Sequence, residues 1–183
     1  MTGNERGQLI AVDGVSGVAL AAEARRALKA SGRARGGISW WDASGLFDQL
    51  TVAGEEAGAA SPRTLLLLYA ADLAFRLRWE IEPTLSEGKT VVAAPYVDTA
   101  VAFGRAAGLR GRWLQNLFQF AMRPAARRDV AVRSRSGAPP RGFVEFASAR
   151  VSRRVLGLTR QQLMARTRAH LTVMAGRSRR RMA

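Results

Sequence analysis

The chain has 183 residues, 48% of them hydrophobic, and a formal net charge of +15 at pH 7. This length and composition predict one domain, residues 1–183, with one sizeable core. The absence of cysteine and the single histidine, His170, exclude disulfides, thiolate metal sites, cysteine nucleophiles and a histidine zinc cluster. No apolar run approaches the roughly 20 residues of a membrane span, and residues 1–7 lack the apolar segment of a signal peptide. We therefore expect a cytoplasmic protein with no membrane partner.

The positive charge is concentrated in the last third of the chain. Residues 1–122 carry 13 Lys and Arg against 12 Asp and Glu, whereas residues 123–183 carry 16 Arg against 2 acidic residues. An arginine-rich tail is expected at about 176–183. Such a surplus suits an acidic partner, nucleic acid or a nucleotide. The alternative is a solvated, arginine-heavy surface, which the scarcity of lysine, with only Lys29 and Lys89, supports.

Strands and helices alternate in the first part of the chain. The short apolar run at 9–12 predicts a strand, and residues 18–30, rich in helix formers, predict a helix. The β-branched and aromatic stretch after Gly36 and Gly37 predicts a second strand, and a helix is expected from Leu46 to Ala57. This alternation is typical of a parallel sheet.

A long, mostly apolar helix is predicted next. Ser61 is its expected N-cap, with Pro62 at the first helical position. We expect Pro83 to kink or end its first part and Gly88 to end the remainder. The apolar run at 90–94 predicts a strand that is buried on both faces.

The rest of the chain is predicted to be mainly helical. The expected elements are helices at about 97–107 and 112–122, a weak strand at 129–133, a loop at 134–141, and helices near 143–156 and from Thr159 to about Ala175. Thr159 and Gln162 are spaced as a capping box. The pattern as a whole predicts an α/β fold in which helices flank a parallel sheet.

The turn after the first strand has the spacing of a phosphate-binding loop without its chemistry. The working pattern is G-x-x-x-x-G-K-[ST], in which backbone N–H groups and a lysine bind phosphate and a hydroxyl holds Mg²⁺. Aligned from Gly14, the second glycine is Ala19, the lysine is Leu20 and the hydroxyl is Ala21. The alternative is a strand and helix that never bound a nucleotide, in which Gly14 and Gly17 only preserve the tight turn.

Further segments match one family in order and spacing. They are the turn at Trp41 to Gly45, residues 61–74 (SPRTLLLLYAADLA), residues 81–92 (IEPTLSEGKTVV) and residues 95–103 (PYVDTAVAF). With the first turn, these segments resemble the thymidylate kinase family across residues 8–103. The resemblance implies a three-layer, P-loop NTPase-like α/β fold and a homodimer that pairs through helices. It also implies ATP, Mg²⁺ and dTMP as the ligands of an active member.

Carried over position by position, the resemblance implies remnants of two binding sites. The phosphate loop is represented by Gly14, Ser16 and Gly17, with Ser16 in place of the family's loop carboxylate. Two phosphate-contacting arginines are replaced by Leu73 and Pro95. The retained dTMP-site positions are Asp42, Tyr69, Asp72, Tyr96 and Asp98, with Tyr69 at the base-stacking position.

The retained residues also have purely structural interpretations. Tyr69 and Phe75 suit a core or a dimer contact. Asp72, on a largely apolar helix, requires a partner such as an arginine or a backbone N–H group. Asp98 follows a predicted strand and suits either a helix cap or a site.

The missing groups bear directly on activity. Phosphoryl transfer depends on positioning and on electrostatic stabilisation, and the loss of one such contact costs about 10² to 10³ in rate. We therefore expect a catalytically inactive homologue that needs no cofactor, binds nucleotide weakly if it binds one, and acts by binding or dimer assembly. The apolar faces of residues 65–85 and 114–120 would form the dimer.

Two alternatives remain open. One is an atypical dTMP kinase that uses ATP and Mg²⁺, with arginines of residues 133–160 or of the C-terminus in place of the lost ones. The other is a nucleic-acid binder that uses the arginine-rich tail.

Overall fold

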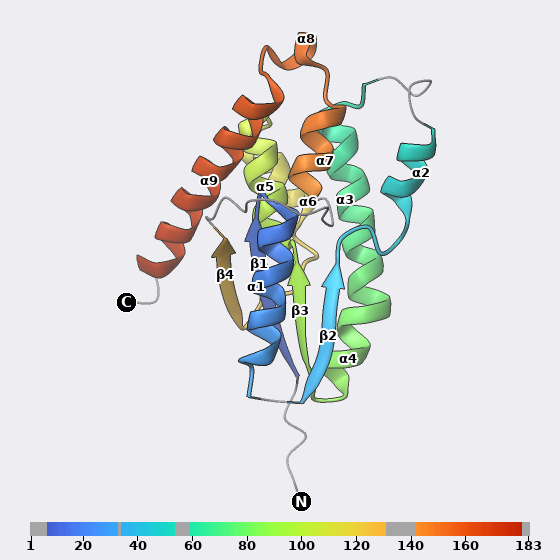
Figure 1. The fold of residues 1–183 in the computed structure, drawn as a ribbon, viewed down its shortest axis with the longest axis vertical. Helices are drawn as coiled ribbons and strands as arrows, with labels where there is room; N and C mark the ends of the chain where they lie inside the picture. Colours follow the sequence, from blue (N-terminus) through green and yellow to red (C-terminus); the bar gives the residue numbers. More distant parts are fainter. Residues whose placement is uncertain (1–6, 33, 54–58, 131–141, 181–183) are drawn as a thin grey trace, which may run out of the picture.

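The computed structural model of the protein describes residues 7–32, 34–53, 59–130 and 142–180. Within them, four parallel strands form one sheet in the order β2-β3-β1-β4 (Figure 1). The strands are β1 at Gln8–Gly14, β2 at Arg35–Trp40, β3 at Thr90–Ala94 and β4 at Ala126–Val130. The predicted parallel sheet is confirmed, and β3 is buried along its whole length, as expected.

Helices cover both faces of this sheet. They are α1 at Gly17–Lys29, α2 at Leu46–Val52, α3 at Pro62–Arg76, a π-helical turn η1 at Leu77–Ile81, α4 at Glu82–Ser86, α5 at Val97–Ala106, α6 at Gly111–Leu117, α7 at Phe143–Arg150, α8 at Arg153–Leu156 and α9 at Arg160–Arg180. Side chains of a strand alternate between its two faces. In β1, Ile10 and Val12 accordingly pack against α1, whereas Leu9 and Ala11 join the core formed with α3, α5, α7 and α9. The fold therefore has three layers (Figure 1).

The long apolar helix is continuous through Pro83. Ser61 caps it as predicted, since its Oγ accepts a hydrogen bond from the Thr64 N–H at 3.0 Å. Pro83 neither ends nor breaks the helix, because the wider π-helical turn η1 directly precedes it and α4 continues through it. Gly88, with φ of +75°, follows the end of the helix as predicted.

The boundaries differ most in the second half of the chain. Strand β4 begins at Ala126, three residues before the predicted start, because Arg127 and Arg128 extend from the sheet edge to acidic partners on neighbouring helices. Residues 131–141, including the predicted loop, lie outside the described residues. Helix α6 ends at Leu117, earlier than predicted. The predicted helix at 143–156 is split at Val151, which forms an isolated parallel bridge with Ala60.

The last helix is longer than predicted. Thr159 and Gln162 form the expected capping box, with reciprocal hydrogen bonds of 2.8 and 3.2 Å. Helix α9 runs to Arg180 and so includes most of the predicted tail. Leu163, Thr167 and Leu171 recur at intervals of four residues and are buried where α9 packs along α5. No helix among the described residues is long and apolar enough to cross a membrane.

Candidate functional site

The residues singled out from the sequence lie at or beside the carboxyl edge of the sheet. Gly14 ends β1, Asp42 follows β2, and Tyr96 and Asp98 follow β3. Tyr69 and Asp72 reach the same edge from α3, as their hydrogen bonds to residues 42–44 and 95–96 show. Ligands of open parallel sheets bind at this edge. The candidate site therefore comprises the turn after β1 and the polar cluster beneath α3.

The turn between β1 and α1 is short. Only Val15 and Ser16 separate the strand from the helix, and Gly17 already begins α1. Ser16 is the N-cap residue, but its side chain makes no capping hydrogen bond, and its carbonyl oxygen accepts the Leu20 N–H at 2.9 Å. Three of the six positions of the G-x-x-x-x-G pattern are therefore helical, and only two residues are left for the loop between β1 and α1.

The positions of the missing lysine and hydroxyl are buried in the helix–sheet core. Leu20 has no exposed surface and packs with Ile10, Val12 and other apolar residues between α1 and the sheet. Ala21 is 8% exposed. A Cβ added at Gly14 would meet the Leu20 side chain at 3.3 Å, so this leucine lies directly against the end of β1.

A carboxylate from the distant helix α7 lies at the turn. Oε2 of Glu145 accepts hydrogen bonds from the backbone N–H of Gly17 at 3.1 Å and from that of Gly142 at 2.9 Å. The two segments touch, because a Cβ added to Gly142 would lie 2.9 Å from the Gly17 nitrogen and 3.2 Å from the Val15 carbonyl oxygen. The N–H group at the start of α1 therefore has a partner within the chain.

A second buried carboxylate ties β1 to α5. Oδ1 of Asp13 accepts hydrogen bonds from the Thr99 hydroxyl at 2.7 Å, the Thr99 N–H at 2.9 Å and the Tyr96 N–H at 3.0 Å. The Gly14 N–H in turn donates to the Thr99 hydroxyl at 3.0 Å. Burial, assisted by the charge of Asp98, raises the pKa of Asp13 to about 7. The Gly14 N–H group thus has its hydrogen-bond partner within the protein.

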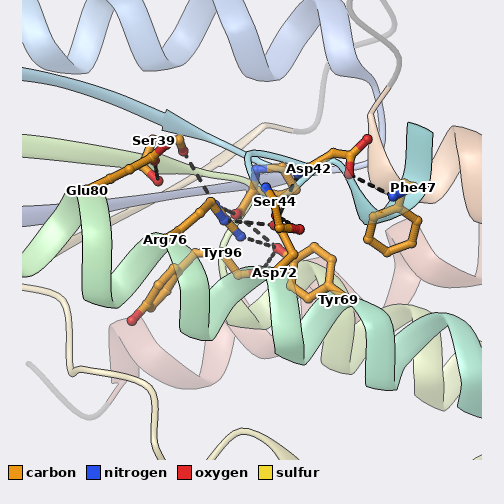
Figure 2. A network of polar contacts seen from close by, with 10 residues as sticks. Ser39, Asp42, Ser44, Phe47, Tyr69, Asp72, Arg76, Glu80 and Tyr96 are labelled. Carbon is orange, nitrogen blue, oxygen red and sulfur yellow. Dashed lines mark hydrogen bonds and ion pairs between the residues drawn. The ribbon is translucent and has the colours of Figure 1, made fainter. Parts of the chain in front are cut away.

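Asp72 is the centre of the polar cluster at the other side of the edge (Figure 2). Its carboxylate accepts hydrogen bonds from the Asp42 N–H at 3.1 Å, the Ser44 N–H at 3.0 Å and the Ser44 hydroxyl at 2.9 Å. It also pairs with Nε of Arg76 at 3.0 Å, and both side chains are fully buried. The expectation that Asp72 needs an arginine or backbone N–H partner is confirmed, since it has both.

Asp42 holds the turn after β2 together. Its backbone has a φ of +62°, rare for a residue other than glycine. Its Oδ1 accepts the Phe47 N–H at 2.8 Å, at the start of α2. Burial raises the pKa of the Asp42 carboxyl, an effect that the hydrogen bond from Phe47 opposes. Asp42 therefore acts in turn geometry and helix capping.

Arg76 fills the space between α3 and the strand ends. Its Nη1 donates to the carbonyl oxygens of Pro95 at 3.2 Å and Ser39 at 3.4 Å. Tyr69 donates its hydroxyl hydrogen to the carbonyl oxygens of Pro95 and Tyr96, at 2.9 and 3.0 Å. Burial raises the pKa of Tyr69, so the phenol stays protonated. The guanidinium thus serves the protein's own carbonyls and carboxylate (Figure 2).

An aromatic cluster covers Tyr69. The ring of Phe143, at the start of α7, lies 4.5 Å from the Tyr69 ring, centroid to centroid. Phe143 and Phe146 also meet Trp41 and Phe47 edge to face, at centroid distances of 5.5 to 5.9 Å. Tyr69 itself is fully buried. The ring at the predicted base-stacking position is therefore buried and packed against the first residue of α7.

The two remaining candidates lie beside β4. Asp98, in the first turn of α5, forms an ion pair with Arg127 of β4. The Tyr96 hydroxyl donates to the Met122 carbonyl oxygen at 2.8 Å, and burial raises the pKa of Tyr96 to about 12. Both residues join β3 and α5 to the chain around β4.

Four residues of the site were missed in the sequence: Asp13, Arg76, Thr99 and Glu145. Asp13 was detectable as an acidic residue that ends an apolar strand, and Arg76 as a cation four residues after Asp72 on one helix. Thr99 and Glu145 contact partners 85 and 128 residues away, and no local pattern marks such contacts.

One cavity in the described part of the chain lies apart from these residues. No group of three or more histidine, aspartate or glutamate side chains there could hold a metal ion. A cavity of about 270 Å³ lies between α7, α8 and α9, and its wall includes none of the candidate residues. Its lining consists of Ser148, Ala149, Val151, Leu156, Leu158, Thr159, Arg160 and Leu163.

Known proteins show local similarity to this chain, although no family model matches it. Thymidylate kinase of Desulfosudis oleivorans is 50% identical over 62 residues, which cover 33% of this chain and 29% of the relative. A probable thymidylate kinase of Thermococcus gammatolerans is 41% identical over 58 residues, 32% of this chain and 28% of the relative. The chain thus spans less than a third of the length of these relatives.

The fold has a counterpart among solved structures. Thymidylate kinase of Ehrlichia chaffeensis superposes with a TM-score of 0.58 at 14% identity, over 68% of this chain and 71% of that chain. At that identity the superposition shows the fold alone. The similarity to thymidylate kinases in sequence is limited to the local segments above. The chain is therefore similar to thymidylate kinases in local sequence, and it shares a layered α/β fold with a solved member of that family.

Proposed function

We propose that this thymidylate kinase-like protein does not transfer phosphate and acts through binding or dimer assembly. The observation that carries the proposal is Leu20, which stands at the lysine position and is fully buried between α1 and the sheet. A side chain at this position faces the core and does not reach a phosphate. Ala21 cannot supply the hydroxyl that holds Mg²⁺.

The polar cluster supports the same proposal. Catalysis of phosphoryl transfer needs cationic groups aimed at the transferring phosphate. Arg76 is fully buried, and its guanidinium is occupied by Asp72 and by carbonyl oxygens of Ser39 and Pro95. Tyr69 is covered by Phe143. These contacts leave the retained residues with structural roles.

Calorimetry with ATP, with and without Mg²⁺, tests the proposal. We expect no binding, or a dissociation constant above about 1 mM. A coupled assay with ATP and dTMP should show no turnover above the rate of a sample without the protein, with an active thymidylate kinase as positive control. Micromolar ATP affinity together with turnover would instead establish the atypical kinase.

The assembly part of the proposal rests on an exposed apolar face. Leu67, Phe75 and Trp79 lie along α3 and η1, and they are 53%, 39% and 65% exposed. Large exposed apolar residues gathered on one face mark protein contacts. We propose that a second copy of the chain covers this face.

Sedimentation velocity tests the dimer. The wild type should sediment as a dimer, and Trp79→Glu should shift it to a monomer because the charge enters the contact. Val173→Glu is the matched control, because Val173 is 51% exposed on α9, which lies at the opposite side of the molecule from α3 in Figure 1. A monomeric wild type, or a Trp79→Glu variant that remains dimeric, would remove this part of the proposal.

A second candidate function is the binding of nucleic acid through α9. No Asp or Glu follows Glu145 in the sequence, and α9 presents exposed Arg166, Arg177 and Arg180. Binding to duplex DNA should then weaken with salt, with a logarithmic slope of about −0.9 per neutralised phosphate. Deletion of residues 177–183 should reduce that slope. If neither salt nor the deletion changes the affinity, these arginines form a solvated surface and do not bind nucleic acid.

A further inference from the structure

One oxygen of Glu145 serves the starts of two helices. Its Oε2 accepts the N–H of Gly17, the first residue of α1, and the N–H of Gly142, the residue before α7. The first N–H groups of a helix lack intrahelical partners and carry a partial positive charge, so a carboxylate is favourable at either helix start. Here the same carboxylate is placed at both.

Only one of these two bonds is a local helix cap. A glutamate three residues after the N-cap commonly bonds back to the N-cap N–H, as Glu145 does with Gly142. The bond to Gly17 spans 128 residues and requires α7 to lie directly on the turn. Gly142 permits this approach because a Cβ there would lie 2.9 Å from the Gly17 nitrogen.

Aromatic packing holds α7 in this position. Phe143 is fully buried, and its ring contacts those of Tyr69, Phe47 and Trp41 at centroid distances of 4.5, 5.9 and 5.9 Å. Because the Phe143 ring is packed on several sides, it fixes the start of α7. The carboxylate of Glu145, two residues later, is fixed with it. Glu145 is therefore presented to α1 by a rigid element.

A helix N-terminus that follows a strand and a glycine turn is a general anion-binding position. We propose that Glu145 is the resident anion of the α1 N-terminus, an internal carboxylate that stands where a phosphate would otherwise bind. It closes the turn and docks the C-terminal helices onto the sheet. The inference rests on the proposed function, because a phosphate bound at Gly17 would have to displace Glu145.

Thermal unfolding of charge variants tests the inference. Glu145→Ala should lower Tm by about 4 to 8 °C, because two N–H groups lose a charged acceptor. Glu145→Gln should lower it less, since the amide oxygen still accepts hydrogen bonds but carries no charge. Glu87→Ala is the matched control, because Glu87 is exposed and pairs with the exposed Lys89.

Inorganic phosphate then reports on the emptied position. At matched ionic strength against chloride, phosphate should raise the Tm of Glu145→Ala by several degrees more than that of the wild type or of Glu87→Ala. The Gly17 amide should exchange with solvent faster in Glu145→Ala than in the wild type, and phosphate should slow it again. A role in packing alone would not give this rescue.

A steric variant tests the contact without touching the charge. Gly142→Ala should lower Tm, because its Cβ pushes α7 away from Gly17; the Gly142 φ of −76° suits any residue, so backbone strain does not contribute. Gly111→Ala is the control, since a Cβ there meets nothing within 4 Å.

Two results would overturn the inference. One is a Glu145→Ala variant with wild-type Tm and unchanged exchange of the Gly17 amide. The other is phosphate that stabilises wild type and all variants equally, which would reflect the +15 charge of the whole chain. Neither result concerns the binding of ATP or dTMP to the wild type, so the proposed function is judged separately.

Discussion

The two sides of the sheet's carboxyl edge are closed by opposite kinds of chemistry. At the β1–α1 turn, the lysine position is occupied by buried Leu20. Under α3, charges are retained but paired with each other, as Asp72 and Arg76 show. The lysine position on the first side is therefore closed by apolar burial, beside the carboxylate of Glu145, whereas the second side is closed by a buried ion pair. A charge added to the first side should therefore lower the free energy of unfolding by about as much as a charge removed from the second side.

Leu20→Lys is the largest expected effect. The substitution restores the lysine of the phosphate-binding pattern but buries an ammonium group among Ile10, Val12 and Ala24. We expect a loss of about 4 kcal/mol in the free energy of unfolding and no gain in ATP binding. Urea unfolding and ATP calorimetry measure the two results. Val52→Lys, at an 83% exposed position of α2, should stay within about 0.5 kcal/mol of the wild type.

Arg76→Leu tests the ionic side. Removal of one partner leaves the Asp72 carboxylate buried without its counter-charge, which costs about 3 to 5 kcal/mol. Adding Asp72→Asn should recover part of this loss, because the unpaired charge is then gone. Urea unfolding of both single variants and the double variant gives the coupling energy. Additive losses would show that the two side chains act independently.

The same contrast explains how far the sequence could predict the site. Local rules predicted that the buried Asp72 needs a partner, and they could also have identified Arg76, which was missed although it lies one helical turn away. They were also sufficient for the parallel sheet, which the alternation of strands and helices indicates. The caps at Ser61 and Thr159 were predictable because each depends on neighbours within four residues.

Long-range closure could not be predicted in this way. The contact of Glu145 with Gly17 depends on where aromatic packing places α7, and Glu145 by its spacing from Gly142 predicts only a local cap. The β4 boundary was wrong for a related reason, because Arg127 and Arg128 suit a strand only when acidic partners stand on neighbouring helices. Sequence periodicity carries no information on such partners.

A smaller effect is expected from pH at Asp13, which lies between the two sides. Its pKa is raised to about 7 in the folded protein, from 3.8. The unfolded chain therefore releases this proton at lower pH, and the stability that Asp13 contributes below pH 4 is lost as pH rises through 7. Relative to Asp13→Asn, the wild-type free energy of unfolding should fall between pH 4 and 7, by at most about 1.4 kcal/mol per pH unit. Parallel curves for the two proteins, from urea unfolding at each pH, would contradict the assignment.

The smallest effect belongs to a pair outside the edge. Glu87 and Lys89 form an exposed ion pair, with side chains 57% and 43% accessible. Glu87→Gln should cost no more than about 0.5 kcal/mol, and high salt should abolish that cost because exposed charges are screened. The loss from Arg76→Leu should change little with salt, since neither Asp72 nor Arg76 reaches solvent. Urea unfolding of both variants at low and high salt therefore separates the two classes of charge. Equal salt sensitivity would show that water reaches the cluster under α3, and that this side of the edge is open.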